Sequence, residues 1–151
     1  MAVVLGHHAE EIQRAVDFAG VDVVVNPYYQ RGQTSSLQAG LMALNSSAGL
    51  SVEAVLLCLV DHPAVTAEVV HTLTAAFQTT GAAVVVPTFK GQRGHPVLIG
   101  RTLFDELLAL TPEAGANSVI RKHRDATQFV DVGDPGILLD VDDPETYRSL
   151  V

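Results

Sequence analysis

The chain has 151 residues and a formal net charge of -8, and 48% of its residues are hydrophobic while 17% are charged. This length suits one domain with a substantial core, and the composition excludes an intrinsically disordered chain. The negative charge argues against binding to nucleic acid, whose backbone needs concentrated positive charge. The apolar runs are too short to span a bilayer, and we expect no secretory signal and no membrane association. The single cysteine allows no internal disulfide, so a cytoplasmic location is expected.

Strands and helices alternate in the first half of the sequence. Apolar residues 2–6 predict a strand. Apolar side chains at helical spacing then predict a helix that ends at Gly20, and a second strand is predicted at residues 21–26. A polar loop then leads into a helix with a leucine stripe, for which Ser35 or Ser36 is the expected N-cap. An uncharged run predicts a third strand, buried on both faces, at residues 53–60.

The second half continues this alternation. Thr66 opens a helix, residues 82–87 and 97–99 predict strands, and helices are expected at residues 102–110 and 116–123. Late strands are predicted at residues 128–132 and 136–139, and a final helix has Asp143 as its N-cap and Pro144 as its first residue. The order predicts a single α/β domain over residues 1–151, with a Rossmann-like, mainly parallel sheet and helices on both faces.

Asp61 is the first candidate functional residue, because it comes at the end of the uncharged third strand. Ligands of open α/β sheets bind beyond the carboxyl ends of the strands, which favours a metal or substrate contact at Asp61. The alternative is that Asp61 only starts the turn that contains Pro63 and accepts hydrogen bonds from local amides. The residues themselves leave both interpretations open.

Two polar loops are further candidates. Residues 26–36 combine a glycine, serine hydroxyls and the start of a helix, where backbone amides suit an anion or a base edge, although the serines could be only a cap. Residues 90–96 form a basic loop that could contact phosphates or a carboxylate, or could be a solvated turn. In that loop His95 is closely restrained between Gly94 and Pro96.

Asp140 and Asp142 form the third candidate group, after the apolar segment GILL. In an extended backbone their side chains point to opposite faces, so at most one of them should join Asp61 around a shared cation. Two carboxylates together with phosphate oxygens suit Mg²⁺. The alternative is that Asp142 serves only the cap of the final helix.

Four segments taken in order resemble the motifs of the molybdenum cofactor nucleotidyltransferases: NPYYQRGQTSSLQAGL, LLCLVDHPAV, VVPTFKGQRGHPVLIGR and GILLDVDDPETY. They are most similar to the cytidylyltransferase branch that acts on molybdopterin. The resemblance implies a nucleotide-diphospho-sugar transferase fold. It also implies transfer of CMP from CTP to a phosphorylated pterin, with release of pyrophosphate.

The resemblance also implies roles for individual residues. Asp61 would be the catalytic residue and a ligand of Mg²⁺, and Asp140 would be the second carboxylate of the metal site. The implied nucleotide-binding residues lie in the first loop: Asn26, Gly32, Ser35 and Ser36. The implied substrate-binding residues lie in the basic loop and the last motif: Arg93, Gly94, His95, Pro96 and Asp142.

The chain departs from the family at one place. The family begins with a strand that runs into a Gly-rich loop of the pattern LAAGxSxRMGxxK, and this chain contains no such segment, so its first strand matches the family's second. We therefore expect weak or no transferase activity in this form, and a homo-oligomer formed through the edge that the missing first strand leaves. One alternative is a non-catalytic module that binds a pterin or a partner. Another is a cytidylyltransferase for methylerythritol phosphate or a sugar phosphate, although the GHP segment favours the pterin enzymes.

Overall fold

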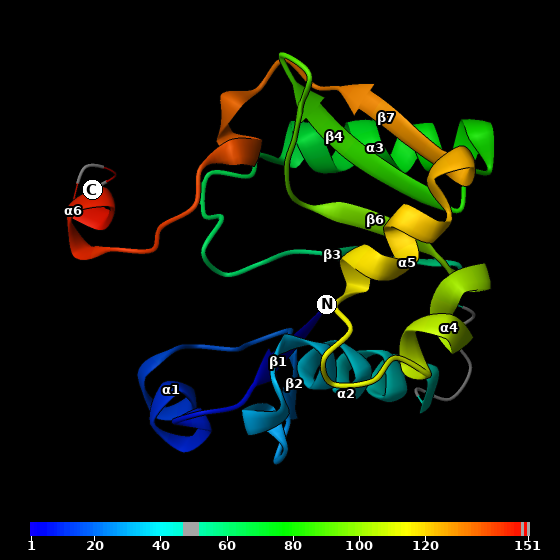
Figure 1. The fold of residues 1–151 in the computed structure, drawn as a ribbon. Helices are drawn as coiled ribbons and strands as arrows, with labels where there is room; N and C mark the ends of the chain where they lie inside the picture. Colours follow the sequence, from blue (N-terminus) through cyan, green and yellow to red (C-terminus); the bar gives the residue numbers. More distant parts are fainter. Residues whose placement is uncertain (47–51, 149, 151) are drawn as a thin grey trace. The chain divides into compact units, whose positions relative to one another are not determined.

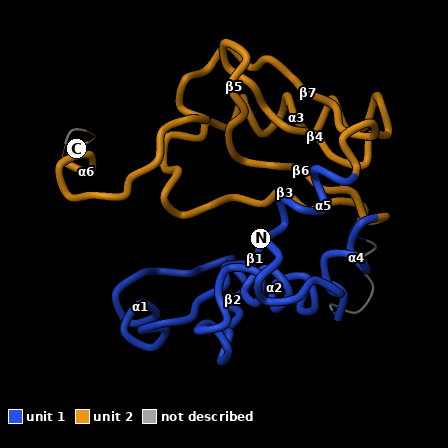
Figure 2. The backbone as a smooth tube through the Cα atoms, in the orientation of Figure 1, with its two compact units in different colours: residues 1–52, 103–122 blue, residues 53–102, 123–151 orange. Residues whose placement is uncertain are grey.

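The computed structural model describes residues 1–46, 52–148 and 150, which form two compact units. The first unit contains residues 1–52 and 103–122, and the second contains residues 53–102 and 123–151 (Figure 2). Each unit has its own sheet and its own buried apolar residues. No helix of the described residues is both long and apolar enough to cross a membrane.

The first unit is built on two parallel strands, β1 (Ala2–Leu5) and β2 (Asp22–Val25), joined through α1 (Ala9–Ala15) (Figure 1). Helix α2 (Gln33–Ser46) packs on both strands. Gly40 makes this close packing possible, because a Cβ atom there would lie 3.0 Å from a methyl carbon of Val4.

Two short helices complete the first unit, α4 (Phe104–Leu108) and α5 (Ala116–Lys122). The side-chain amide of Gln38, on α2, donates hydrogen bonds of 3.2, 3.1 and 2.9 Å to the carbonyls of Leu107, Leu108 and Leu110. These carbonyls lie at the end of α4, where the helix leaves carbonyl groups without intrahelical partners. Gln38 therefore satisfies the end of α4 and joins it to α2.

The second unit holds a five-stranded mixed sheet: β3 (Ala54–Leu57), β4 (Val84–Phe89), β5 (Gln92–Arg93), β6 (Val97–Gly100) and β7 (Thr127–Asp131). Strand β6 lies between β3 and β4 and is antiparallel to both, whereas β7 pairs with β4 in parallel. Strand β4 turns into β5 through Lys90 and Gly91, which both have positive φ angles, of 49° and 80°.

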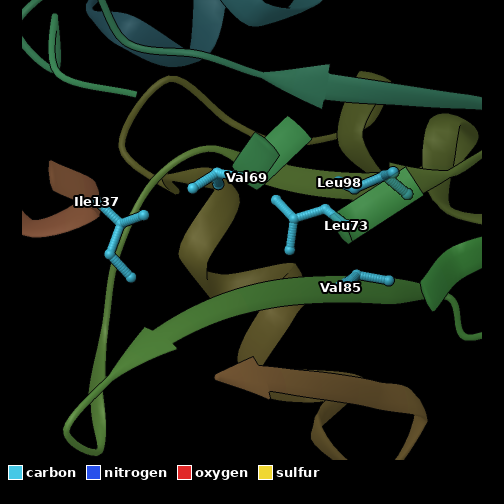
Figure 3. Packing of buried hydrophobic residues seen from close by; sticks show 5 residues of the cluster. All are labelled: Val69, Leu73, Val85, Leu98 and Ile137. Atoms are coloured by element: carbon cyan, nitrogen blue, oxygen red, sulfur yellow. The ribbon is translucent and has the colours of Figure 1, made fainter. Parts of the chain in front are cut away.

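Helix α3 (Ala67–Thr80) covers this sheet and supplies much of the core of the second unit. Figure 3 shows Val69 and Leu73 of α3 packed with Val85 of β4, Leu98 of β6 and Ile137. The hydroxyl of Thr66 accepts a hydrogen bond from the Val69 amide, so Thr66 is the N-cap predicted from the sequence.

Four short 3₁₀ helices complete the described structure: η1 (Tyr29–Arg31), η2 (Arg101–Leu103), η3 (Arg124–Ala126) and η4 (Pro135–Leu138). The last helix, α6 (Pro144–Arg148), begins at Pro144, as predicted from the sequence. Its predicted N-cap is also confirmed, since Asp143 Oδ1 accepts hydrogen bonds from the amides of Glu145 and Thr146.

The predicted α/β alternation is confirmed, but the prediction of one mainly parallel sheet is wrong. The strands form a parallel pair and a separate mixed sheet in which three of the four pairings are antiparallel. The reason is that β5 and β6 follow β4 through tight connections, which bring the chain back antiparallel to β4.

Two further predictions about strands are corrected. Strand β3 is partly exposed at every position rather than buried on both faces, because it pairs only with β6 among the described residues. The most deeply buried strands are β4 and β6. The segment predicted as a strand at residues 136–139 is mostly the helix η4, because Asp134 caps the Gly136 amide and Pro135 starts the turn.

Helix α2 also begins earlier than predicted. Its first residue is Gln33, so Ser35 and Ser36 lie in its first turn and neither is the N-cap.

Candidate functional site

Asp61 lies in a turn beyond the end of β3, and its carboxylate atom Oδ1 is buried with no hydrogen-bond partner among the described residues. Buried polar atoms are normally paired, because leaving one unpaired is costly. The backbone carbonyl oxygen of Asp61 accepts a 2.8 Å hydrogen bond from the Val141 amide. The unpaired Oδ1 is therefore available to a ligand.

His62 and His95 lie against each other beside Asp61, with ring centroids 4.8 Å apart and an angle of 46° between the rings. The Nδ1 atom of each ring is buried and has no hydrogen-bond partner among the described residues. Burial lowers the pKa of His95 below its usual 6.5, and the nearby His62 lowers it further. Asp61 and a hydrogen bond to the Leu57 backbone act in the opposite direction. His95 is therefore held mainly neutral near pH 7.

The antiparallel course of β6 explains why the loop before it reaches Asp61. Val97, the first residue of β6, is paired with Leu57, the last residue of β3, so the loop of residues 94–96 lies at the carboxyl end of β3. The amide of Gly94 donates to the Pro87 carbonyl, and the amide of His95 donates to the Ile137 carbonyl, both at 3.0 Å.

Gly94 allows this loop to approach η4 closely. A Cβ atom at Gly94 would overlap the carbonyl oxygen of Ile137 and would lie 2.7 Å from its Cγ1. Only glycine avoids this overlap without a backbone shift. The glycine of the GHP segment is thus required for packing, whatever its role toward a ligand.

A third segment, residues 134–142, which we call the strap, holds the site together. Asp134 accepts a 3.1 Å hydrogen bond from the Thr66 hydroxyl, and a Cβ atom on Gly136 would lie 2.6 Å from the Ala64 carbonyl oxygen. Farther along, the strap accepts from the amide of His95 and donates from the amide of Val141 to Asp61. The strap therefore ties the Asp61 turn to the loop that carries His95.

Asp140 and Asp142 lie in the strap on either side of Val141, and both are exposed. The described residues contain no group of three or more His, Cys, Asp or Glu side chains arranged to hold a metal ion. A divalent cation at Asp61 would therefore also need phosphate oxygens and water, which is the habit of Mg²⁺ at nucleotide sites.

Arg93 and Pro96, predicted to bind substrate, differ in their surroundings. The guanidinium of Arg93 lies 4.7 Å from the centre of the Phe129 ring, which belongs to β7. Because β7 and β6 lie on opposite sides of β4, this contact directs Arg93 toward the β7 side of the sheet. Pro96 is buried and follows His95 through a cis peptide bond.

The predicted nucleotide-binding loop belongs to the first unit, where Asn26 organises it. Asn26 is 2% exposed, and its amide donates to the hydroxyls of Ser35 and Ser36 at 2.9 and 3.1 Å. Its carbonyl group accepts from the Tyr28 amide at 2.9 Å. Gly32 has a φ of 89°, which places it at the left-handed bend before α2. These side chains therefore hold the loop in shape at the start of the helix.

Within the second unit, the structure brings together Asp61, His95 and the strap that carries Asp140 and Asp142. The sequence interpretation missed His62 as a site residue. Its position directly after Asp61 was a signal, but adjacent residues do not normally face one ligand. Only the contact with His95 shows that the His62 ring belongs to the cluster.

The fold is that of nucleotide-transferase-like α/β proteins. The chain matches the solved Rv0371c homologue from Mycobacterium sp. strain JC1 with a TM-score of 0.79 and 28% identity, covering 99% of this chain and 72% of that chain. The structure of Rv0371c from Mycobacterium tuberculosis H37Rv in complex with manganese gives a TM-score of 0.79 and 27% identity, with coverage of 99% and 76%.

A more distant likeness concerns the fold alone. Molybdopterin-guanine dinucleotide biosynthesis protein A from Archaeoglobus fulgidus matches with a TM-score of 0.66 and 13% identity, covering 97% of this chain and 75% of that chain. A search of curated proteins found no match.

Residues 1–127 match the family described as the MobA-like NTP transferase domain. The chain belongs to this family. The predicted resemblance to the molybdenum cofactor nucleotidyltransferases is thereby confirmed at the level of the family.

Proposed function

We propose that this chain is a cytidylyltransferase-type domain that uses CTP and Mg²⁺ and whose acceptor is a phosphorylated pterin. The family match and the four ordered motifs support this proposal. The observation that carries it is the buried Oδ1 of Asp61, which has no hydrogen-bond partner among the described residues and lies in a cluster that the strap ties together.

The donor set around Asp61 suits a hard divalent cation. Asp61 would be the first ligand and Asp140 the second, with the remaining ligands supplied by water and phosphate oxygens. When bound, the cation would neutralise charge on the triphosphate. The manganese in the structure of Rv0371c supports a divalent metal in this family.

The other residues would bind and orient the two substrates. The loop of Asn26, Gly32, Ser35 and Ser36 would contact the nucleotide at the start of α2, where backbone amides attract anions. Residues 93–96 and Asp142 would face the acceptor. The reaction would be an in-line attack by the acceptor phosphate on the α-phosphorus, forming a P–O bond while the bond to pyrophosphate breaks. Positioning and neutralisation of charge would be the main catalytic contributions.

The proposal is tested by paramagnetic broadening of the amide NMR signals on addition of Mn²⁺ with CTP, a method that detects weak binding. We expect the amides of His62 and Val141 to broaden first, because Val141 is hydrogen-bonded to Asp61. Asp61→Asn should remove this pattern. Asp22→Asn, which changes an exposed carboxylate of β2, is the matched control and should leave it intact.

Broadening that persists unchanged in Asp61→Asn would refute the metal site. A protein that binds a pterin but shows no effect of Mn²⁺ with CTP would instead support the non-catalytic binding module.

A further inference from the structure

We propose that Ser36 contacts the nucleotide by donating its hydroxyl proton to an acceptor atom of the ligand, and that Asn26 is a positioning residue for this hydroxyl. The assignment rests on the proposed function for the identity of the ligand. It deepens that function, because it gives different tasks to Asn26, Ser35 and Ser36.

The side-chain amide of Asn26 has only one possible orientation. Asn26 is 2% exposed, and its Oδ1 lies 2.9 Å from the backbone nitrogen of Tyr28. Because a backbone N–H can only donate, the atom that meets it must be the carbonyl oxygen. The NH₂ group therefore meets the hydroxyl oxygens of Ser35 and Ser36, at 2.9 and 3.1 Å. Both N–H bonds of Asn26 are thus used within the loop, which makes Asn26 a residue that positions others.

The two serine hydroxyls differ in where their single proton goes. The Oγ atom of Ser35 lies 3.0 Å from the Tyr28 carbonyl oxygen and 2.8 Å from that of Gly32. Carbonyl oxygens only accept, so the proton of Ser35 is used within the loop. The half-buried Ser36 accepts from Asn26, and its hydroxyl has no acceptor among the described residues. The proton of Ser36 is therefore available to a ligand.

The hydroxyl of Ser36 also differs from other hydroxyls on helices. A serine or threonine within a helix can donate to the carbonyl four residues back. Ser46 in the same helix and Thr74 in α3 both do so at 2.8 Å. Within the described part of the chain Ser36 makes no such bond, and the carbonyl four residues before it, that of Gly32, accepts from the amide and the hydroxyl of Ser35. The helix therefore does not use the proton of Ser36.

A hydroxyl with an available proton selects acceptor atoms of a ligand. A nucleotide offers them on its phosphates, its ribose and its base, and their shared feature is a lone pair. A hydrogen bond to an ionised phosphate oxygen would be the strongest of these. Asn26 supports the donation, because an amide that donates to the Ser36 oxygen polarises the hydroxyl and strengthens the hydrogen bond that it makes in turn.

The first test compares two alanine variants by adding CTP with Mg²⁺ to ¹⁵N-labelled protein and following the amide NMR signals. Ser36→Ala should raise the Kd for CTP roughly tenfold, because one hydrogen bond to the ligand is lost. Ser35→Ala also loses a hydrogen bond from Asn26, and it loses the contacts with the loop carbonyls in addition. If Ser36 only shaped the loop, Ser35→Ala would weaken binding at least as much, and that result would overturn the proposal.

The matched control is Ser46→Ala, which removes a hydroxyl of α2 whose proton is used by the Met42 carbonyl. This variant should bind CTP as the wild type does, and equal binding by Ser36→Ala and Ser46→Ala would contradict the proposal. Cytidine and inorganic triphosphate, used as separate probes, locate the acceptor atom. A loss in Ser36→Ala with cytidine assigns the contact to the nucleoside, and a loss with triphosphate assigns it to the phosphates. A loss with neither probe would refute the contact.

Asn26→Asp tests the positioning role. A carboxylate can still accept from the Tyr28 amide, but it cannot donate to Ser36 and would take the Ser36 proton instead. We therefore expect Ser36→Ala to weaken CTP binding roughly tenfold in the wild-type background and to cause no further loss in the Asn26→Asp background. An equal loss in both backgrounds would show that Asn26 does not act through Ser36. The comparison of Ser35→Ala with Ser36→Ala does not depend on the folding of Asn26→Asp.

The outcomes separate this contact from the proposed function. If the wild type binds CTP and Ser36→Ala binds it equally well, only the contact of Ser36 is refuted. If CTP binding depends on Ser36 but Mn²⁺ with CTP does not broaden the amide signals near Asp61, the contact is supported and the proposed metal site is refuted. A wild-type chain that does not bind CTP would refute both.

Discussion

The amide of Val141 donates a 2.8 Å hydrogen bond to the carbonyl oxygen of Asp61, and this bond joins two segments that lie far apart in the sequence. Because this hydrogen bond joins only backbone atoms, the side chains of Asp61, Asp140 and Asp142 take no part in it. The contact is therefore a scaffold that brings carboxylates to the site without pairing them.

The first prediction concerns these two aspartates. Asp140→Asn should weaken the binding of Mn²⁺ in the presence of CTP by roughly tenfold, about 1.4 kcal/mol, because it removes the proposed second carboxylate. Asp142→Asn should affect binding of the acceptor more than binding of the metal. Calorimetric titrations of both variants measure the difference, and a stronger loss of metal binding in Asp142→Asn would reverse the assignment.

The second prediction concerns the close approach at Gly94. Gly94→Ala should lower the free energy of unfolding by about 1–3 kcal/mol, since its Cβ would overlap the Ile137 carbonyl and force the strap outward. Gly115→Ala is the control, because no atom of the described residues lies within 4 Å of the Cβ position there and its φ is outside the left-handed region. Urea unfolding measures the free energy of unfolding of both variants. Equal values would contradict the prediction and show that the strap can move away from a Cβ atom at residue 94 without loss of stability.

The third prediction is a dependence of stability on pH. Burial, with the neighbouring His62, lowers the pKa of His95 in the folded protein, so the unfolded chain binds a proton at a higher pH than the folded chain does. The stabilising contribution of neutral His95 to the free energy of unfolding should therefore be complete above pH 6.5. It should decrease as the pH falls from 6.5 toward the lower pKa that His95 has in the folded protein. Denaturant unfolding of the wild type and His95→Gln between about pH 8 and pH 5 measures this, and the variant should show the flatter dependence. If the free energies of unfolding of the wild type and His95→Gln change with pH in the same way, His95 makes no contribution to the pH dependence of stability.

The fourth prediction concerns the core of the second unit. Leu73 is fully buried between α3 and the sheet, so Leu73→Ala should destabilise the protein by about 2–5 kcal/mol. Val60→Ala is the matched apolar truncation at a side chain that is 99% exposed, and it should change stability by less than about 0.5 kcal/mol. Amide hydrogen exchange of α3 and β4 reports the second unit specifically. Unchanged protection of these amides in Leu73→Ala would contradict the assigned core.

The fifth prediction concerns the free edges of the sheets. Among the described residues, β3 pairs only with β6 and β1 pairs only with β2, so each strand has one edge without a partner strand. Unpaired edges promote association. We expect self-association that increases with protein concentration in analytical ultracentrifugation. A protein that stays monomeric at the highest accessible concentration would refute this expectation.

Local features were the most predictable from the sequence. Thr66 and Asp143 were recognised as N-caps because a cap depends on hydrogen bonds to amides only two or three residues away. An apolar run that stops at a carboxylate makes Asp61 a candidate site residue. The four ordered motifs identified the family because each is a contiguous segment, and the match over residues 1–127 confirms it.

Pairing and contact between distant segments were decided only by the tertiary structure. Strand β6 has the same apolar pattern as a parallel strand, and only its antiparallel pairing with β3 brings His95 beside Asp61 and His62. The segment GILL looks like a strand, yet the cap of Asp134 on Gly136 and the packing against Gly94 make it a 3₁₀ helix within the strap. The sequence alone therefore determined the elements and the candidate carboxylates. The tertiary structure decided which side chains share a site, because strand direction and close backbone approach depend on contacts that no local pattern encodes.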